Sequence, residues 1–253
     1  MKGNVVTKLF LSMVCVVFVS LYAGEMKVAV AANANDVVKA LIKSFKQHHP
    51  HTHIEVILGS SGKLTAQIMH GAPFDLFLSA NMDYPNRLYR VKKAITKPIV
   101  YAEGALAIFS RKKRDFCAEI FVLKDRDIQK IAIGNPKTAP YGAAAIDALR
   151  NARIYDKIKD KLVYGESISQ TLGYVMGAAD IGIVAKSSLY APSMSLYKEA
   201  IHWTELDETL YTPIKQGMVL LEHAQDNIEA KAFYDFVKST EAKQILKSYG
   251  YKI

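Results

Sequence analysis

The sequence predicts an α/β protein whose largely parallel sheets are divided between two lobes. Strand patterns alternate with helical patterns along most of the chain, and this alternation is typical of helices that cover a parallel sheet. A strand, a polar turn and a helix start follow one another four times, around residues 32–36, 59–64, 140–143 and 166–169. Two of these units lie in each half of the chain. We therefore expect two lobes that face one another across a cleft, each a mixed, largely parallel sheet flanked by helices.

The N-terminus is predicted to be a secretory signal peptide. Residues 1–8 carry two lysines, residues 9–23 are apolar except for two serines, and Ala23 ends a small-residue cleavage pattern. This apolar core is short for a membrane span. We therefore expect residues 1–23 to be cleaved during export. The rest of the sequence contains no second apolar stretch of membrane-spanning length.

The charge and cysteine content narrow the classes of partner. Without Lys2 and Lys8, 31 basic and 24 acidic residues remain, a net charge of about +7. Such a surplus of positive charge is typical of proteins that bind anionic ligands, and it is also typical of an ordinary solvated surface. The densest basic run, residues 111–114, is predicted to be a loop, and no interleaved aromatic pattern indicates nucleic acid. Cys117 stands alone once Cys15 is removed, so no intramolecular disulfide is possible.

The first elements predict a sheet with ligand-facing loops. A strand at residues 26–32 precedes a helix whose apolar stripe includes Val37, Leu41 and Phe45. Asn33 follows that strand. Its side chain either caps the helix or faces the crevice where ligands bind at the carboxyl ends of parallel strands. Buried strands are then predicted at residues 54–58 and 74–78, with a helix from residue 64 to residue 71.

The turn at residues 59–63, Gly-Ser-Ser-Gly-Lys, is the motif that most directly predicts a function. A helix start carries unpaired N–H groups and a partial positive charge, so the two hydroxyls beside it suit an anion. The alternative is that Ser60 or Ser61 only caps the helix. The spacing differs from that of a Walker A loop.

The second half predicts the second lobe and a return to the first. Two apolar runs between residues 97 and 110 indicate a strand that leaves one sheet and enters another. Further strands are predicted at 130–134, 162–165, 180–185 and 212–221, with helices at 143–150, after 166, and at 227–249. The lobes are therefore expected to comprise residues 24–103 with 212–253, and residues 104–211.

A histidine cluster offers a competing function, that of a metal receptor. It contains His48, His49, His51 and His53. Pro50 prevents this segment from forming a helix, and no cysteine or carboxylate lies near it in the sequence to complete a set of metal ligands. We therefore favour a solvated loop. The motif loops also lack a Ser/His/Asp arrangement, paired carboxylates and metal-ligand spacing. We therefore expect a binding protein and not an enzyme.

Taken together, these motifs resemble the molybdate-binding periplasmic proteins, the soluble receptors of molybdate ABC importers. The resemblance rests on residues 59–68, 71–77, 135–145 and 248–251 and extends over nearly all of the mature chain. It implies a two-lobed periplasmic solute-binding fold, molybdate and tungstate as transported ligands, no cofactor, and a membrane permease as partner. It also implies a monomer in the periplasm. The same fold could instead bind another tetrahedral oxyanion, such as sulfate or phosphate.

The resemblance implies four ligand residues, and the chain differs from some relatives at one further position. It implies side-chain donors from Asn33 and Ser61 and backbone N–H donors from Tyr141 and Ile168. Where some relatives have a tyrosine after the Gly-Ile-Val strand, this chain has Ala185, so one phenolic donor is absent. Molybdate at neutral pH only accepts hydrogen bonds, so a site of N–H and O–H donors suits it. Lys63 is expected to be solvated and not to touch the ion.

Overall fold

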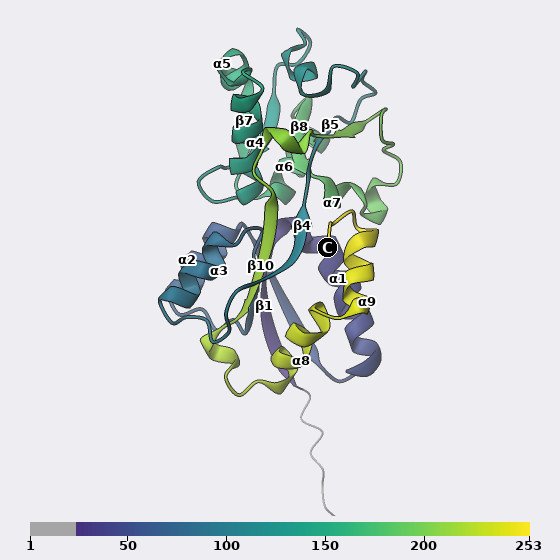
Figure 1. The fold of residues 1–253 in the computed structure, drawn as a ribbon. Helices are drawn as coiled ribbons and strands as arrows, with labels where there is room; N and C mark the ends of the chain where they lie inside the picture. The colour runs from purple at the N-terminus through teal and green to yellow at the C-terminus, as the bar shows by residue number, and fades with distance from the viewer. Residues whose placement is uncertain (1–23) are drawn as a thin grey trace, which may run out of the picture.

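The computed structural model describes residues 24–253 and has the two lobes that the sequence predicts (Figure 1). Each lobe contains one mixed sheet flanked by helices, so the predicted fold class is confirmed. The predicted signal peptide, residues 1–23, lies outside the described residues. Within residues 24–253, no helix is both long enough and apolar enough to span a membrane.

The first lobe is built on five strands in the order β2-β1-β3-β10-β4. Strand β1 is parallel to β2 and β3, whereas β10 runs antiparallel to β3 and β4. The carboxyl ends of β1, β2 and β3 therefore meet at one edge of the sheet, where the loops that follow them face the second lobe. The strands are β1 (Glu25–Ala31), β2 (His53–Gly59), β3 (Leu76–Leu78), β4 (Ile99–Gly104) and β10 (Ile214–Leu220).

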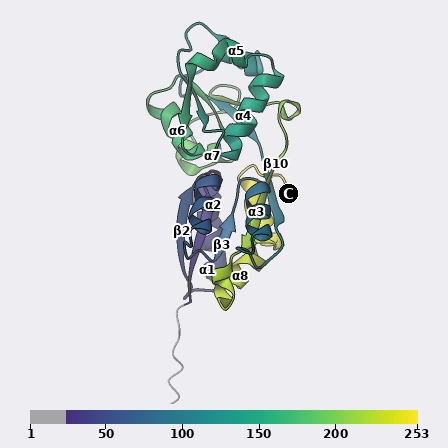
Figure 2. The same ribbon diagram turned by 90° about the vertical axis from the view of Figure 1, so that its left-hand side faces the viewer.

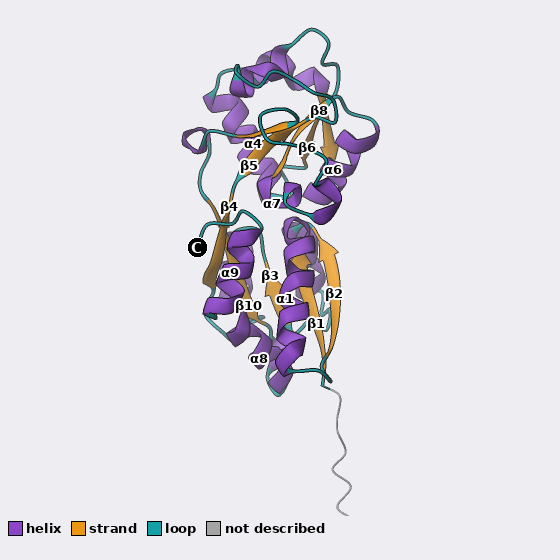
Figure 3. Cartoon of the chain, turned by 90° about the vertical axis from the view of Figure 1, so that its right-hand side faces the viewer, coloured by secondary structure: helices purple, strands orange, loops and turns teal. Residues whose placement is uncertain are grey.

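Helices cover both faces of this sheet. Because side chains alternate along a strand, Val28 and Val30 of β1 pack into the core beneath one set of helices, while Ala29 between them packs into the core beneath the other set. The first set is α1 (Asn35–His48), α8 (Ile228–Val237) and α9 (Thr240–Ser248), and it faces the viewer in the lower lobe of Figure 3. The second set is α2 (Ser61–Met69) and α3 (Asp83–Arg90), and it faces the viewer in Figure 2.

The second lobe repeats this arrangement with the strand order β7-β6-β8-β5-β9. Strand β6 is parallel to β7 and β8, and β5 is antiparallel to β8 and β9. Its strands are β5 (Leu106–Phe109), β6 (Ile131–Gly134), β7 (Leu162–Gly165), β8 (Ile181–Ala185) and β9 (Trp203–Glu205). Its helices are α4 (Pro140–Asn151), α5 (Tyr155–Ile158), α6 (Ile168–Gly177) and α7 (Lys186–Leu189).

Two neighbouring segments join the lobes. Only Ala105 separates β4 of the first sheet from β5 of the second, and the chain returns between β9 and β10. Gly104 and Ile214 pair at the point of crossing, and Figure 1 shows β4 and β10 rising side by side towards the second lobe. Both crossings lie close to their expected positions. The lobe boundaries at 103/104 and 211/212 stay a prediction, and each lobe is identified below by its sheet.

Three details of the prediction are wrong. Strand β2 was expected to be buried, but it lies at the edge of its sheet and Leu58 is 46% exposed. Helix α4 begins at Pro140 and not at residue 143, because proline is well suited to the first helical position. Strand β9 and helices α3, α5 and α7 were not predicted. A three-residue edge strand such as β9 is too short to show a hydrophobic period.

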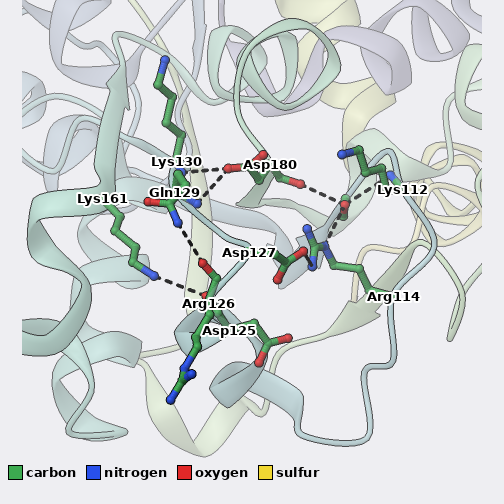
Figure 4. A network of polar contacts seen from close by, with 10 residues as sticks. Lys112, Arg114, Asp125, Arg126, Asp127, Gln129, Lys130, Lys161 and Asp180 are labelled. Carbon is green, nitrogen blue, oxygen red and sulfur yellow. Dashed lines mark hydrogen bonds and ion pairs between the residues drawn. The ribbon is translucent and has the colours of Figure 1, made fainter.

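The basic run at residues 111–114 is a loop after β5, as predicted, and it belongs to a structural network (Figure 4). The Arg114 guanidinium lies 2.9 Å from the carboxylate of Asp127 and also donates to the hydroxyl of Ser110. Asp180 accepts hydrogen bonds from the backbone N–H groups of Gln129 and Lys130. These backbone donors, together with nearby cationic side chains, lower the pKa of the Asp180 carboxyl despite its partial burial. The network stabilises the lobe away from the cleft.

The remaining short helices are 3₁₀ turns. The first of them precedes α1 and carries Asn33. They are η1 (Ala32–Ala34), η2 (Glu119–Lys124), η3 (Lys159–Lys161), η4 (Pro192–Met194), η5 (Glu208–Leu210) and η6 (Glu222–Ala224).

Candidate functional site

A small cavity lies between the lobes, at the edge where the parallel strands end. The free space at this site measures about 200 Å³, and part of it is open to solvent. The first lobe contributes residues from β1, η1, the start of α2 and the segment after β3, and the second lobe contributes the starts of α4 and α6. Its walls are Ala31, Ala32, Asn33, Ser60, Ser61, Ala80, Ala139, Pro140, Tyr141 and Ile168. All four ligands implied by the resemblance are therefore brought together, and the ten wall residues are all uncharged.

Ser61 presents a hydroxyl to this cavity and is not a helix cap. It is the first residue of α2, and its Oγ accepts a hydrogen bond from the backbone N–H of Ala80 at 2.9 Å. The residue at the N-cap position is Ser60, whose side chain makes no capping hydrogen bond. The capping alternative for both serines is therefore wrong, because neither hydroxyl is used by the helix.

Three helix starts point backbone donors at the same space. Ser61 and Ile168 are the first residues of α2 and α6, and Tyr141 is the second of α4, so the N–H group of each has no acceptor within its own helix. Because Pro140 has no N–H, Tyr141 carries the first donor of α4. Gly142 lets this helix start approach β6, since a Cβ there would lie 2.2 Å from the carbonyl oxygen of Gly134. Converging helix termini favour a negatively charged ligand.

Asn33 lies on the cavity wall, and its buried side chain is hydrogen-bonded to other parts of the protein. It is buried in η1 and does not cap α1, whose N-cap residue is Ala34. Its amide Nδ2 donates to Gln216 Oε1 at 2.9 Å and to the Tyr251 hydroxyl at 3.0 Å. Its Oδ1 is the one buried side-chain polar atom in residues 24–253 that has no hydrogen-bond partner.

Four contacts close the lobes around the cavity. The N–H of Gly62 donates to the carbonyl of Thr138 at 3.0 Å. The hydroxyls of Ser169 and Ser187 donate to the carbonyls of Ala32 and Asn33, at 2.9 and 3.2 Å. Outside the wall, the Lys63 ammonium lies 3.4 Å from the Glu166 carboxylate. Lys63 is exposed as expected, but it is not merely solvated, because it bridges the lobes.

Behind the cavity, buried phenols surround the amide of Gln216. Tyr101 donates to Gln216 Oε1 at 2.8 Å, and Gln216 Nε2 donates to the Tyr141 hydroxyl at 3.1 Å. Burial raises the pKa of Tyr101 and Tyr141 well above the ordinary phenol value and also raises that of Tyr251. The phenols therefore stay neutral and act only as hydrogen-bonding groups at physiological pH.

Sequence reasoning missed this group. Gln216, Tyr101 and Tyr251 come from distant parts of the chain. Tyr251 lies in the motif at residues 248–251, but no local pattern brings the three side chains together. Ala185 is buried at the end of β8 and is not among the cavity wall residues. The nearby hydroxyl of Ser187 instead binds the backbone of Asn33.

The histidine cluster lies at the far end of the first lobe, between α1 and β2. His49 stacks on Phe45, with ring centroids 4.1 Å apart, and its Nδ1 lies 3.3 Å from the carboxylate of Glu229. His48, His51 and His53 are exposed. The part of the chain that the structure describes contains no grouping of three or more histidine, cysteine or acidic residues suited to a metal ion.

The comparisons agree with this geometry. The sequence profile of the bacterial extracellular solute-binding proteins matches residues 26–252. The chain belongs to this family. The molybdate-binding protein ModA of Rhodobacter capsulatus is 37% identical over 231 residues, covering 90% of this chain and 88% of its own length. The ModA protein of Azotobacter vinelandii is 36% identical, with 90% of both chains covered.

A solved structure supports the same assignment. The periplasmic molybdate-binding protein of Azotobacter vinelandii superposes with a TM-score of 0.83 at 29% identity, covering 90% of this chain and 99% of that protein. The superposition supports the two-lobed fold of this chain. The cavity between the lobes is therefore the site from which a function is to be argued.

Proposed function

We propose that this chain captures molybdate between its lobes and delivers it to the permease of an ABC importer. The observation that carries the proposal is the convergence of three helix starts and the Ser61 hydroxyl on one small, uncharged cavity. Such a wall donates hydrogen bonds and offers no carboxylate, so it suits a fully deprotonated tetrahedral oxyanion. The relatives named as molybdate-binding proteins support the choice of oxyanion. Tungstate, a near-isostere, is expected to bind as well.

The proposed ligands are the side chains of Asn33 and Ser61 and the backbone N–H groups of Tyr141 and Ile168. A hydrogen bond to a charged group contributes roughly 1.5–3 kcal/mol, and each helix terminus adds about 0.3–2 kcal/mol. Four such donors, three of them at converging helix starts, suffice for tight binding without a lysine or arginine contact. The role is binding and transport, and no cofactor or catalytic group is required.

The proposal includes a place and a partner. Residues 1–23 would direct export and be removed, leaving a monomer in the periplasm that meets the permease with its lobes closed. Mass spectrometry of the protein recovered from the periplasmic fraction tests this, since cleavage near Ala23 predicts a mature chain that begins at about residue 24. A recovered chain that still contains residues 1–23 would contradict it.

Thermal unfolding of the ligand-free protein tests the ligand. Molybdate and tungstate are expected to raise the melting temperature, and about 2.7 kcal/mol of stabilisation is expected at a hundred times the dissociation constant. Sulfate and phosphate are expected to have little effect. An equal response to sulfate or phosphate would identify another oxyanion as the ligand. A response to Zn²⁺ or Ni²⁺ alone would favour the histidine-based alternative.

A further inference from the structure

The buried amide of Asn33 is turned the wrong way for an oxyanion. Its Oδ1 is on the side without a protein partner, while both Nδ2 protons are donated to Gln216 and Tyr251. Two acceptors that face one another repel, and a buried acceptor without a donor is costly. A deprotonated oxyanion therefore requires the opposite orientation, with the N–H groups turned towards the cavity.

The surrounding network allows that reversal if Gln216 turns with Asn33. After both amides rotate by 180°, Gln216 Nε2 donates to Asn33 Oδ1 and to the Tyr101 hydroxyl, while Gln216 Oε1 accepts from Tyr141. The Tyr251 hydroxyl, which donates to the Asn33 carbonyl at 3.2 Å, turns instead to Asn33 Oδ1. That carbonyl keeps the hydroxyl of Ser187 as a donor. The four contacts between side chains survive, the contact of Tyr251 to the Asn33 carbonyl is given up, and Asn33 Nδ2 becomes free for the ligand.

We infer that Gln216 is a positioning residue that sets which end of the Asn33 amide faces the oxyanion. Gln216 is fully buried on β10 and is not part of the cavity wall, so it acts through Asn33 and not by contact. An amide donates on one side and accepts on the other, so Gln216 can turn with Asn33 and keep its contacts to Asn33, Tyr101 and Tyr141. The inference rests on the proposed function, because it requires an oxyanion in the cavity.

The position of the network gives it a second consequence. Gln216 and Tyr101 lie on the two strands that join the lobes, Tyr141 on α4 of the second lobe and Tyr251 near the C-terminus. A Cβ on Gly104 would lie 1.9 Å from the Tyr141 hydroxyl and 2.7 Å from Gln216 Nε2, so the network packs directly against the crossing. The orientation of Asn33 is therefore linked to the closed arrangement of the lobes.

A double-mutant cycle with molybdate tests the inference. We expect Gln216→Met to lower affinity by about 10- to 150-fold, the loss associated with one charge-assisted hydrogen bond. Asn33→Ala should lower it by a similar factor. If Gln216 acts through Asn33, adding Gln216→Met to Asn33→Ala should change the affinity by less than about threefold. Equal losses in both backgrounds would mean that Gln216 only supports the fold, and would overturn the inference.

Tyr101→Phe is the second probe, because it keeps the ring in the core and removes only the hydroxyl that holds Gln216. Tyr101→Phe should weaken molybdate binding in the wild-type background. Added to Asn33→Ala, it should leave the molybdate affinity of that variant unchanged. The matched control is Tyr211→Phe, since this buried hydroxyl accepts from the Leu106 N–H at the crossing but is outside the network. The affinity of Tyr211→Phe for molybdate should stay within about twofold of wild type. Equal losses for the two phenylalanine variants would contradict the inference.

The wild-type titration separates the inference from the function on which it rests. If wild type does not bind molybdate, the proposed function and the inference both fail. If wild type binds but the two losses are additive, only the positioning role fails. A direct readout is the side-chain NH₂ signal of Asn33, assigned by its disappearance in Asn33→Ala. Molybdate should shift this signal in wild type, and an unchanged signal would overturn the inference.

Discussion

The hydroxyl oxygen of Ser61 accepts a hydrogen bond from the backbone N–H of Ala80 at 2.9 Å. Ala80 lies just beyond β3, and both residues belong to the wall of the cavity between the lobes. A serine hydroxyl has a single proton. Because its oxygen already accepts from Ala80, the O–H is oriented and its proton is available to a ligand. The contact supports the proposed role of Ser61 as a hydrogen-bond donor to the ligand.

Ser61→Ala should weaken molybdate binding by about 10- to 150-fold, or roughly 1.5–3 kcal/mol, because it removes a charge-assisted hydrogen bond in a buried site. It should also lower the free energy of unfolding of the ligand-free protein by about 1–3 kcal/mol, since the N–H of Ala80 loses its acceptor. Calorimetric titration and urea unfolding measure the two effects.

Ser110→Ala is the matched control. Ser110 is also fully buried and its Oγ also accepts a backbone N–H, that of Lys112 at 3.2 Å, but its other partners are Arg114 and the carbonyl of Asp180, away from the cleft. Ser110→Ala should lower the free energy of unfolding and leave the affinity for molybdate unchanged. Wild-type affinity in Ser61→Ala would mean that Ser61 is only a turn residue and that the centre of the proposed site is wrong.

The site could be predicted from the sequence where its hydrogen-bond donors are marked by short-range sequence patterns. A helix start after a strand, marked by Ser60 and Ser61 or by Pro140, is a short-range pattern that also fixes where its N–H groups point. This is why the predicted ligands, from four separated segments, meet at one cavity. The two-lobed fold was predictable for the same reason, because alternating strands and helices determine the layers.

The parts that could not be predicted depend on contacts distant in sequence. The partners of Asn33 are 183 and 218 residues away, at Gln216 and Tyr251. Gln216 carries no local signal, and the motif that contains Tyr251 does not indicate its contact with Asn33. The partner of Lys63 is Glu166, 103 residues away. Whether an apolar strand such as β2 lies at the edge or in the centre also depends on the strand order, which its own residues do not determine.

Lys63→Gln and Glu166→Gln should each weaken molybdate binding by no more than about fivefold. Both side chains are more than half exposed, and exposed ion pairs contribute about 0.2–1 kcal/mol. The double variant should lose no more than either single variant, and the effect should disappear at high salt. A loss above about 20-fold in Lys63→Gln would indicate that the ammonium contacts the ion directly.

The three exposed histidines should be dispensable for binding. Replacing His48, His51 and His53 with asparagine should leave molybdate affinity within about twofold of wild type, because they lie at the far end of the first lobe. His49→Asn should lower the free energy of unfolding, since it removes the ring stacked on Phe45. Calorimetry and thermal unfolding measure the two effects. A large loss of affinity in the triple variant would mean that this loop is coupled to the cleft.

The buried phenols predict a loss of stability in alkaline solution. Burial keeps Tyr101 and Tyr141 protonated in the folded protein, because it raises the pKa of each well above the ordinary value. In the unfolded chain they ionise near pH 10. The unfolded state therefore binds fewer protons above that pH, so the free energy of unfolding falls as the pH rises, by up to about 1.4 kcal/mol per pH unit for each phenol. Below about pH 9 the contribution is fully present.

Urea unfolding between pH 8 and pH 11 measures this slope. Tyr101→Phe should make it shallower by up to about 1.4 kcal/mol per pH unit, and adding Tyr141→Phe should reduce it again by a similar amount. An unchanged slope in the double variant would show that these phenols ionise in the folded protein. That result would also weaken the case for Gln216, because a phenolate can only accept hydrogen bonds and the network needs phenols that can either donate or accept.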